Sequence, residues 1–292
     1  MNALIFGANG QDGYYVSELC RSSGMTVKGI SRTGAWIQGD VADYEQVEHF
    51  VKKYQPAFIF NLAANSTTRH DAVFDNHRAI STGTLNILEA VKRNSPESRV
   101  FVTGSGVQFK NRGIPISERD EFDPNSPYSV ARIHSVYAAR YYRSLGIKAY
   151  VGYLFHHESP LRKPNHLSQI IVNAVRGIAN GNNGSLELGD ISVEKEWTFA
   201  GDVAEGILTL MWQDEVMEAV IGSGIKHSVL DWVKECFQII GKDWREYVRL
   251  KEGFVPEYNC LVSDPSTIFS LGWKPKVNLK SLAELMMKKG NV

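Results

Sequence analysis

Residues 3–13 read Ala3-Leu4-Ile5-Phe6-Gly7-Ala8-Asn9-Gly10-Gln11-Asp12-Gly13, an apolar run that leads into a G-x-x-G-x-x-G motif. The apolar run predicts a short buried strand, and the amphipathic stretch from about Tyr14 to Ser23 predicts a helix after the glycines. Glycine lets the backbone approach a phosphate closely, and a helix N-terminus offers free N–H groups to a pyrophosphate. This context is the one that a dinucleotide-binding motif requires. A tight glycine turn without a ligand is the alternative.

Segments with strand and helix patterns alternate through the first 155 residues. The sequence predicts strands at 3–6, 26–30, 57–62, 99–103 and 148–154, and helices at 14–23, 44–54, 83–92 and 126–145. This alternation is typical of the α/β class, here a Rossmann-type doubly wound parallel sheet with helices on both faces. Beyond residue 155 the predicted elements are mainly helices, at 167–179, 203–212, 230–240 and 279–288. We therefore expect a dinucleotide-binding domain at 1–155 and, at 156–292, a smaller mixed substrate lobe that partly returns to the sheet.

Composition narrows the class of protein. The chain has 292 residues, 43% of them hydrophobic and 22% charged, so a disordered or collagen-like chain is excluded. Its 32 Lys and Arg balance 32 Asp and Glu, whereas non-specific nucleic-acid binders carry a basic excess. Three separated cysteines (Cys20, Cys236, Cys260) predict neither a disulfide framework nor a metal site. The sequence lacks the pattern of a secretory signal or of a membrane span, so we expect a soluble cytoplasmic protein.

Two residues after the second predicted strand bear on the choice of dinucleotide. Arg32 lies where the adenosine ribose of a bound dinucleotide is expected, and an Arg at this place accommodates a 2′-phosphate. It therefore favours NADP over NAD as the cofactor, unless it is an ordinary surface residue. Asp40 is placed to accept a hydrogen bond from an adenine amine, or to cap the helix that follows.

A tyrosine and an arginine open the long helix predicted at 126–145. Tyr128 and Arg132 are four residues apart, so they share a helix face. A cation beside a phenol favours the phenolate form, which can exchange a proton with an alcohol or a ketone. Ser105 follows the strand at 99–103 and reaches the same crevice, where its hydroxyl would polarise the reacting oxygen. Without the glycine motif, such a pair would be read as surface residues.

Motifs along nearly the whole chain make it resemble the extended short-chain dehydrogenases/reductases, and among these the GDP-mannose 4,6-dehydratase family. The most specific is the His-Glu-Ser-Pro stretch at 157–160. The others are Gly10-Gln11-Asp12-Gly13, Asn61-Leu62-Ala63-Ala64-Asn65-Ser66, Gly83-Thr84-Leu85-Asn86-Ile87-Leu88-Glu89-Ala90, Ser126-Pro127-Tyr128, Ser263-Asp264-Pro265 and Leu271-Gly272-Trp273-Lys274-Pro275. The resemblance implies an enzyme with a bound NAD(P) that removes hydride from C4 of a nucleotide-linked sugar. In that family Tyr takes the C4 hydroxyl proton, Glu drives loss of water across C5–C6, and the hydride returns at C6.

The resemblance also implies which residues hold the cofactor. Arg32 matches a 2′-phosphate contact, Asp40 with Val41 matches an adenine contact, and Arg132 matches the anchor of the nicotinamide ribose. The other matched positions are Gly7, Gly10, Gln11, Asp12, Gly13, Leu62, Ala63, Ala64, Ser66, Tyr128, His157 and Arg162.

The chain departs from the family pattern at several of its functional positions. The Thr-Ser-Glu of the family falls on Ser105-Gly106-Val107, and Val107 offers no proton acceptor for C5. The usual Tyr-x-x-x-Lys becomes Tyr-x-x-x-Arg, which keeps a charge but changes the donor geometry. Two basic residues of the nucleotide-base loop fall near Ser168 and Gln169, and an Arg falls on Phe254. These changes weaken the case for dehydration and for recognition of GDP.

Three functions follow as hypotheses. The first is a redox enzyme at C4 of a nucleotide sugar, acting as a dehydrogenase, a 4-keto reductase or an epimerase. The second is a true dehydratase that uses another base. The third is an inactive homologue that senses NADP(H) or binds a partner protein. The resemblance also implies a homodimer, or a higher homo-oligomer, formed through helices near 82–92 and 128–142.

Overall fold

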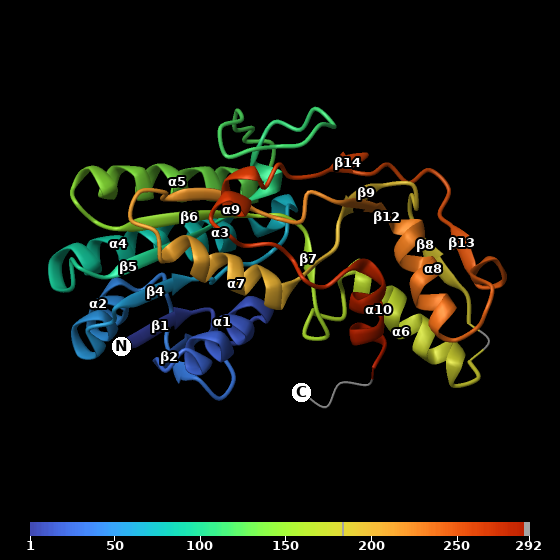
Figure 1. Cartoon of the computed structure of the whole chain (residues 1–292), viewed down its shortest axis with the longest axis horizontal. Coiled ribbons are helices and arrows are strands. Elements are labelled where there is room, and N and C mark those ends of the chain that lie inside the picture. Colours follow the sequence, from blue (N-terminus) through green and yellow to red (C-terminus); the bar gives the residue numbers. More distant parts are fainter. Residues whose placement is uncertain (183, 289–292) are drawn as a thin grey trace.

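The computed structural model describes residues 1–182 and 184–288, and its centre is a parallel sheet with strand order β11-β6-β5-β4-β1-β2-β3 (Figure 1). Every neighbouring pair in this sheet is parallel. The strands are β1 (Asn2–Phe6), β2 (Thr26–Ser31), β3 (Ile37–Gln38), β4 (Phe58–Asn61), β5 (Arg99–Ser105), β6 (Ala149–Leu154) and β11 (Glu218–Ile221). The strand order reverses beside β1, and in open α/β sheets ligands bind at such a switch point.

Helices cover both faces of the sheet because alternate strand residues point to opposite sides. In β1, Leu4 and Phe6 pack with α2 (Tyr44–Tyr54), α4 (Gly83–Asn94) and α5 (Pro127–Ser144). Ala3 and Ile5 pack on the other face with α1 (Gln11–Ser22), α7 (Ala200–Met211) and α9 (Ser266–Ser270). The predicted Rossmann-type doubly wound fold is therefore confirmed.

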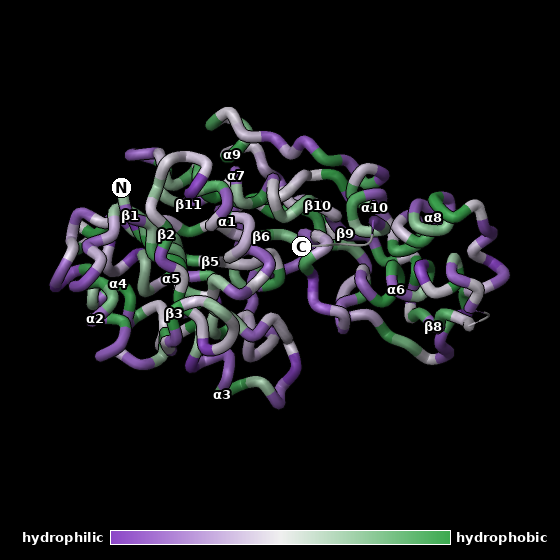
Figure 2. Tube along the Cα trace, turned by 90° about the horizontal axis from the view of Figure 1, so that it is seen from below, coloured by the Kyte–Doolittle hydropathy of each residue, from purple (hydrophilic) through white to green (hydrophobic). Residues whose placement is uncertain are grey.

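A second lobe packs beside the carboxyl ends of the strands. Its helices are α6 (Leu167–Ala179), α8 (Val229–Ile239) and α10 (Leu279–Met287). They enclose a separate apolar core in which Trp197 stacks on Trp232 at 4.8 Å between ring centroids. Figure 2 shows hydrophobic segments in α6 and α8, apart from those of the sheet.

Short strands complete this lobe. The chain pairs β7 (His157–Glu158) with β10 (Thr198–Phe199), and β8 (Leu186–Leu188) with β13 (Val248–Leu250). Strand β9 (Glu194–Glu196) lies between β12 (Lys226–Ser228) and β14 (Cys260–Leu261). Two short helical turns lie in connecting segments of the chain: η3 (Gly106–Gln108) follows β5 of the main sheet, and η4 (Trp244–Glu246) precedes β13. Helix α7 and strand β11 come after residue 155 but belong to the layers of the main sheet. The division of the chain into two domains at residue 155 stays a prediction. Asn183 and residues 289–292 of the predicted second unit lie outside the described residues.

The longest helical segment that is absent from the sequence prediction comprises residues 70–82. Residues 70–82 form η1 (His70–Ala72), α3 (Val73–Asn76) and a π-helical stretch η2 (His77–Thr82) that continues into α4. Few apolar residues mark it, since its buried positions include Asn76 and Ser81 as well as Ala72 and Ile80. The amphipathic pattern of residues 70–82 was therefore too weak to predict a helix there.

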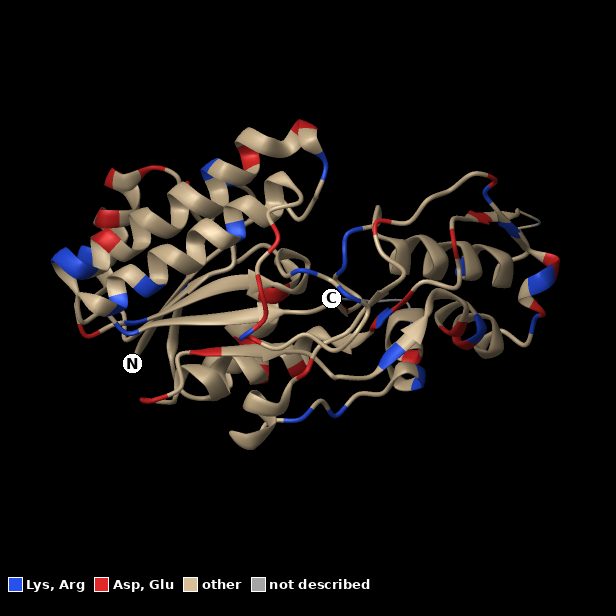
Figure 3. Ribbon diagram, turned by 90° about the horizontal axis from the view of Figure 1, so that it is seen from above, with Lys and Arg blue, Asp and Glu red and all other residues tan. Residues whose placement is uncertain are grey.

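Both signs of charge are distributed over the two parts of the molecule (Figure 3). None of the helices in the described ranges has the length and apolarity to cross a bilayer. Cys20 and Cys236 are buried free thiols, and Cys260 is partly exposed. The cytoplasmic location stays a prediction.

Candidate active site

The glycine turn between β1 and α1 forms one wall of the site. Gly7 has φ +86°, and a Cβ there would lie 2.7 Å from the backbone of Leu62 and Ala63. A Cβ on Gly13 would lie 2.4 Å from the carbonyl oxygen of Gly7. Only glycine therefore lets β1, the loop after β4 and the start of α1 approach so closely. Gly10 precedes α1, and no side chain caps this helix end, so its N–H groups face the turn as an anion site would require.

A cavity of about 290 Å³ opens beside this turn. Its lining includes Arg32 after β2, Arg78 from η2 and Lys163 from the second lobe. The predicted cofactor residues that line it are Gly7, Gly10, Arg32, Asp40, Val41, Leu62, Ala63 and Ala64.

Asp40 does not cap α2. The Asp43 carboxylate performs that role by accepting from the Gln46 backbone N–H at 3.1 Å. Asp40 instead accepts from the Ala42 N–H through Oδ1 and from the Arg78 guanidinium through Oδ2, at 3.0 and 2.8 Å. The helix-cap reading of Asp40 is therefore wrong.

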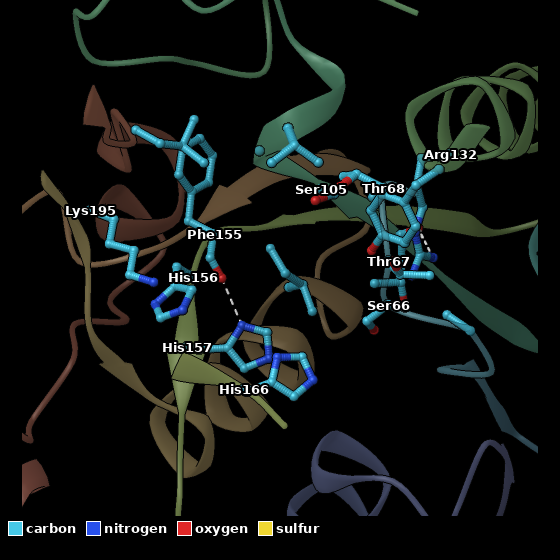
Figure 4. Close-up of a pocket in the computed structure, with 18 of the residues that line it drawn as sticks. Ser66, Thr67, Thr68, Ser105, Arg132, Phe155, His156, His157, His166 and Lys195 are labelled. Atoms are coloured by element: carbon cyan, nitrogen blue, oxygen red, sulfur yellow. Dashed lines mark hydrogen bonds between the residues drawn. The ribbon is translucent and has the colours of Figure 1, made fainter. Parts of the chain in front are cut away.

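A second cavity, of about 390 Å³, lies at the carboxyl ends of β4, β5 and β6. It shares Leu62 and Ala64 with the first cavity, so the two meet at the loop after β4. The predicted residues on its wall are Asp12, Leu62, Ala64, Ser66, Ser105, Tyr128, Arg132, His157 and Arg162. Figure 4 shows Arg132 and Ser105 with the 66–68 loop on one side, and His156 with Lys195 on the other.

Tyr128 and Arg132 lie in the first two turns of α5, as their spacing predicts. The Ser126 hydroxyl caps this helix by accepting from the Ser129 N–H at 3.1 Å, and Pro127 occupies the first turn. The Arg132 guanidinium lies over the Tyr128 ring, with Cζ 5.0 Å from the ring centroid. It is buried and donates through Nη1 to the carbonyl oxygen of Thr103 at 2.6 Å. Arg132 is thus fixed between the end of β5 and the tyrosine.

Ser105 ends β5 on the same side of the cavity. Its hydroxyl accepts from the Gln108 backbone N–H, and the Gln108 side chain accepts from the Ser105 N–H at 2.8 Å. The serine is therefore held in place while its own O–H stays able to donate. Val107 also lines this cavity, and it is partly buried against the core. The Val107 side chain is apolar and offers no proton acceptor to this cavity.

The His-Glu-Ser-Pro segment joins the second lobe to the glycine turn. His157 Nε2 lies 2.9 Å from Asp12 Oδ1, and its Nδ1 lies 2.7 Å from the Phe155 carbonyl oxygen. Both partners are acceptors, so both ring nitrogens donate and the ring is an imidazolium. Burial opposes this charge, but Asp12 raises the pKa of His157. Burial alone would raise the pKa of the Asp12 carboxyl, but the neighbouring His157 lowers that pKa to about 2.

Two predicted cofactor positions, Gln11 and Gly13, are not among the described residues that line the two cavities. The Ser159 hydroxyl donates to Gln11 Oε1 at 2.8 Å, so Gln11 links the two lobes. Gly13 serves the close packing of the turn.

A buried charged cluster lies deeper in the second cavity. Glu158 accepts from Ser168 Oγ at 2.6 Å and lies 2.9 Å from His156 Nε2. Burial acts to raise the pKa of Glu158, but His156 and then Arg162 lower it to about 2. Burial lowers the pKa of Lys195, whose ammonium lies 4.7 Å from the Trp197 ring centroid, to about 8. The Glu158 carboxylate is thus matched by the charges of Arg162 and Lys195 at this wall.

Sequence reasoning missed several cavity residues. His156 directly precedes the His-Glu-Ser-Pro stretch but was given no role in the predicted site. His166 and Lys195 have no regular spacing to the predicted motifs, and the fold alone brings them to the cavity. Ser168 and Gln169 are buried in α6, and Gln169 donates to the carbonyl oxygens of Ser159 and Pro160 at 3.3 and 3.2 Å. They support the His-Glu-Ser-Pro segment. Phe254 lies half-exposed outside both cavities.

The residues present fit a nicotinamide dinucleotide. The Gly7 cradle admits no Cβ, Arg32 lines the first cavity, and the two cavities share Leu62 and Ala64 in their walls. When bound, the nicotinamide ring would supply the acceptor or donor of a hydride.

Known proteins share both the sequence and the fold. A family model described as GDP-mannose 4,6 dehydratase matches residues 4–286. The GDP-mannose 4,6 dehydratase 1 of Arabidopsis thaliana is 29% identical over 318 residues, covering 98% of this chain and 88% of that protein. The GDP-mannose 4,6 dehydratase of Dictyostelium discoideum is 31% identical, covering 86% of this chain and 80% of that protein.

Among solved structures, the Thermus thermophilus UDP-glucose 4-epimerase in complex with NAD has a TM-score of 0.85 at 19% identity and covers 100% of both chains. The RMD of Pseudomonas aeruginosa complexed with NADPH has a TM-score of 0.85 at 18% identity, covering 98% of this chain and 97% of that one. At these identities the structures establish the fold.

Proposed function

Because this chain belongs to the GDP-mannose 4,6 dehydratase family, within the extended short-chain dehydrogenases/reductases, we propose that it binds a nicotinamide dinucleotide and transfers hydride at C4 of a nucleotide sugar. The observation that carries the proposal is the meeting of the two cavities. One contains the glycine cradle and the other contains Tyr128 and Ser105, and they join at Leu62 and Ala64.

Three side chains, Tyr128, Arg132 and Ser105, have separate roles in the proposed reaction at C4. The Tyr128 phenolate takes the proton of the C4 hydroxyl as hydride leaves C4, or returns it to a ketone in reverse. The Arg132 guanidinium, held by Thr103, stabilises the negative phenolate by its charge. The Ser105 O–H donates to the C4 oxygen and fixes its position.

The elimination step has no base at position 107. Loss of water across C5–C6 needs a proton acceptor at C5, and Val107 supplies none. We therefore infer that the net reaction is C4 oxidation, 4-keto reduction or epimerisation. Family membership favours the dehydratase reaction as the second candidate, with the base drawn from another residue of the cavity. An inactive NADP(H)-binding homologue is the third.

The cofactor is proposed to be NADP, because Arg32 lines the first cavity and follows β2, where a Rossmann fold places the adenosine ribose. A homodimer is proposed through α4 and α5. Exposed apolar side chains on these helices support it: Leu85, Val130, Tyr137, Tyr141 and Leu145.

One experiment separates these functions. The wild type, Tyr128→Phe and Val107→Glu are incubated with NADP⁺ or NAD⁺ and a panel of nucleotide sugars that includes GDP-mannose. Mass spectrometry then follows oxidation, epimerisation and loss of water. We expect the wild type to convert a nucleotide sugar without loss of water, and Val107→Glu to remove water from the sugar as well. Tyr128→Phe should bind the dinucleotide within about twofold of the wild type, while hydride transfer falls about 10²–10⁴-fold.

The other outcomes are equally informative. Loss of water by the wild type would establish the second candidate. Stoichiometric cofactor binding without turnover on the whole panel would support the third. Near-normal turnover by Tyr128→Phe would remove Tyr128 from the mechanism.

A further inference from the structure

Two arginines from separate elements line the first cavity, and the proposed function uses only one of them. Arg32 follows β2, and Arg78 lies 46 residues later in the π-helical stretch η2. Both are exposed side chains. The charged residues on the cavity wall are Arg32, Arg78, Lys163, Asp40 and Asp75. Cations therefore exceed carboxylates by one on this wall.

Arg78 is oriented by a carboxylate. Its Nη2 donates to Asp40 Oδ2 at 2.8 Å, and Asp40 is itself held by the Ala42 N–H at 3.0 Å. A guanidinium has five N–H donors. Within residues 1–182 and 184–288, the Arg78 guanidinium donates only to Asp40, so donors remain for a ligand. The ion pair also offsets the negative charge of Asp40, which would otherwise repel an anion in this cavity.

We propose that Arg78 and Arg32 together bind the 2′-phosphate of NADP, with Asp40 as the residue that positions Arg78. The inference rests on the proposed function, because it requires a dinucleotide in the first cavity. A phosphate presents several acceptor oxygens, and a guanidinium can donate two parallel hydrogen bonds to it. NAD has a free ribose hydroxyl at this place and gains little from a second cation. Arg78 would therefore set the preference between the two cofactors.

The test compares Arg78→Met with Arg69→Met. Methionine keeps much of the apolar stem and removes the charge. Arg69 is a matched control, since it is also exposed and paired with an aspartate, Asp71, at 2.7 Å, but it lines neither cavity. Calorimetry would measure the binding of NADP⁺, NAD⁺, 2′,5′-ADP and 5′-AMP to each protein. Circular dichroism would confirm that both variants are folded.

We expect Arg78→Met to weaken NADP⁺ and 2′,5′-ADP binding about tenfold to a hundredfold, the size of a charge-assisted hydrogen bond. NAD⁺ and 5′-AMP binding should change less than about threefold, and Arg69→Met should resemble the wild type. Asp40→Asn should weaken NADP⁺ binding in the wild type and have a much smaller effect in the Arg78→Met background, since the arginine it positions is then gone.

Three results would overturn the inference while the proposed function stands. They are equal effects of Arg78→Met and Arg69→Met, equal weakening of NADP⁺ and NAD⁺, and a wild type that binds NAD⁺ more tightly than NADP⁺. Tighter NADP⁺ binding by Asp40→Asn would remove the positioning role of Asp40. If the wild type binds neither dinucleotide, the proposed function itself fails.

Discussion

The ion pair between His157 and Asp12 ties two distant parts of the sequence together with a pH-dependent bond. Asp12 belongs to the glycine turn and His157 to the segment that leads into the second lobe, and their polar atoms lie 2.9 Å apart. Asp12 raises the pKa of His157 above its ordinary 6.5, against the effect of burial. The stability gained from His157 is therefore complete below about pH 6.5 and is lost as the pH rises through the folded-state pKa.

We predict that His157→Gln lowers the free energy of unfolding most between about pH 4 and pH 6.5. At lower pH the contribution of Asp12 is also lost, because its carboxylate, with a pKa of about 2, becomes protonated. Urea unfolding of the wild type and the variant from acid to alkaline pH would measure this gap. His70→Gln, at an exposed position, is the control. A gap that stays constant through pH 8 would mean that the pKa of His157 is the same in the folded and unfolded protein, and a gap that grows as the pH rises would mean that His157 is neutral in the folded protein.

At the scale of elements, Glu196 at the end of β9 holds three segments together. Its buried carboxylate accepts from the backbone N–H groups of Ser263, Ser223 and Gly224 at 2.6, 2.5 and 3.3 Å. These donors follow β14 and β11, so one side chain joins the second lobe to the edge of the sheet. Removing it leaves several buried donors without an acceptor, each at a cost of about 1–3 kcal/mol.

Glu196→Ala should therefore destabilise the protein by about 3 kcal/mol or more. Glu194→Ala provides the comparison, because Glu194 lies on the same strand but forms an exposed ion pair with Lys226. That pair should contribute less than about 1 kcal/mol. Urea unfolding would measure both losses of stability, provided that the slope of the unfolding free energy against urea concentration is the same in the wild type and the variants. Similar losses for the two variants would contradict the anchoring role of Glu196.

Elements with a clear local pattern were predictable from the sequence. Helix α2 spans the predicted residues 44–54, because an amphipathic pattern follows Asp43 and an exposed Gln55 ends it. Helix α6 likewise spans the predicted 167–179. Five strands of the sheet followed from short apolar runs, although β3, with only two residues, and the edge strand β11 were missed.

Contacts that depend on tertiary structure were not predictable. Asp40 is 38 residues from Arg78, and only the passage of η2 beside the loop after β3 joins them. Lys195 lies between two glutamates, a pattern typical of a solvated strand, yet it is buried on the cavity wall. The sequence therefore indicated the cradle and the Tyr128–Arg132 pair, because these rest on local spacing. It did not indicate the residues that other elements bring to the cavities.

At the scale of the whole molecule, α4 and α5 present apolar side chains that the described residues leave uncovered. Tyr137 and Tyr141 lie one turn apart on α5 and are 58% and 61% exposed, and Leu85 on α4 is 37% exposed. Apolar residues gathered on one surface are typical of protein–protein contacts. A twofold axis would place the same surface of a second copy against this one and bury both.

We predict that the wild type is a dimer in sedimentation velocity and that Tyr141→Glu shifts it to the monomer. A carboxylate at this exposed position of α5 would lose its water where the second copy covers the helix. Ile239→Glu on α8 is the matched control, since Ile239 is 44% exposed on the second lobe, away from α5. It should leave the mass unchanged. A monomeric wild type, or equal dissociation by both variants, would rule out an interface through α4 and α5. Because Tyr128 lies on α5 as well, retained turnover by monomeric Tyr141→Glu would further show that each subunit carries a complete site.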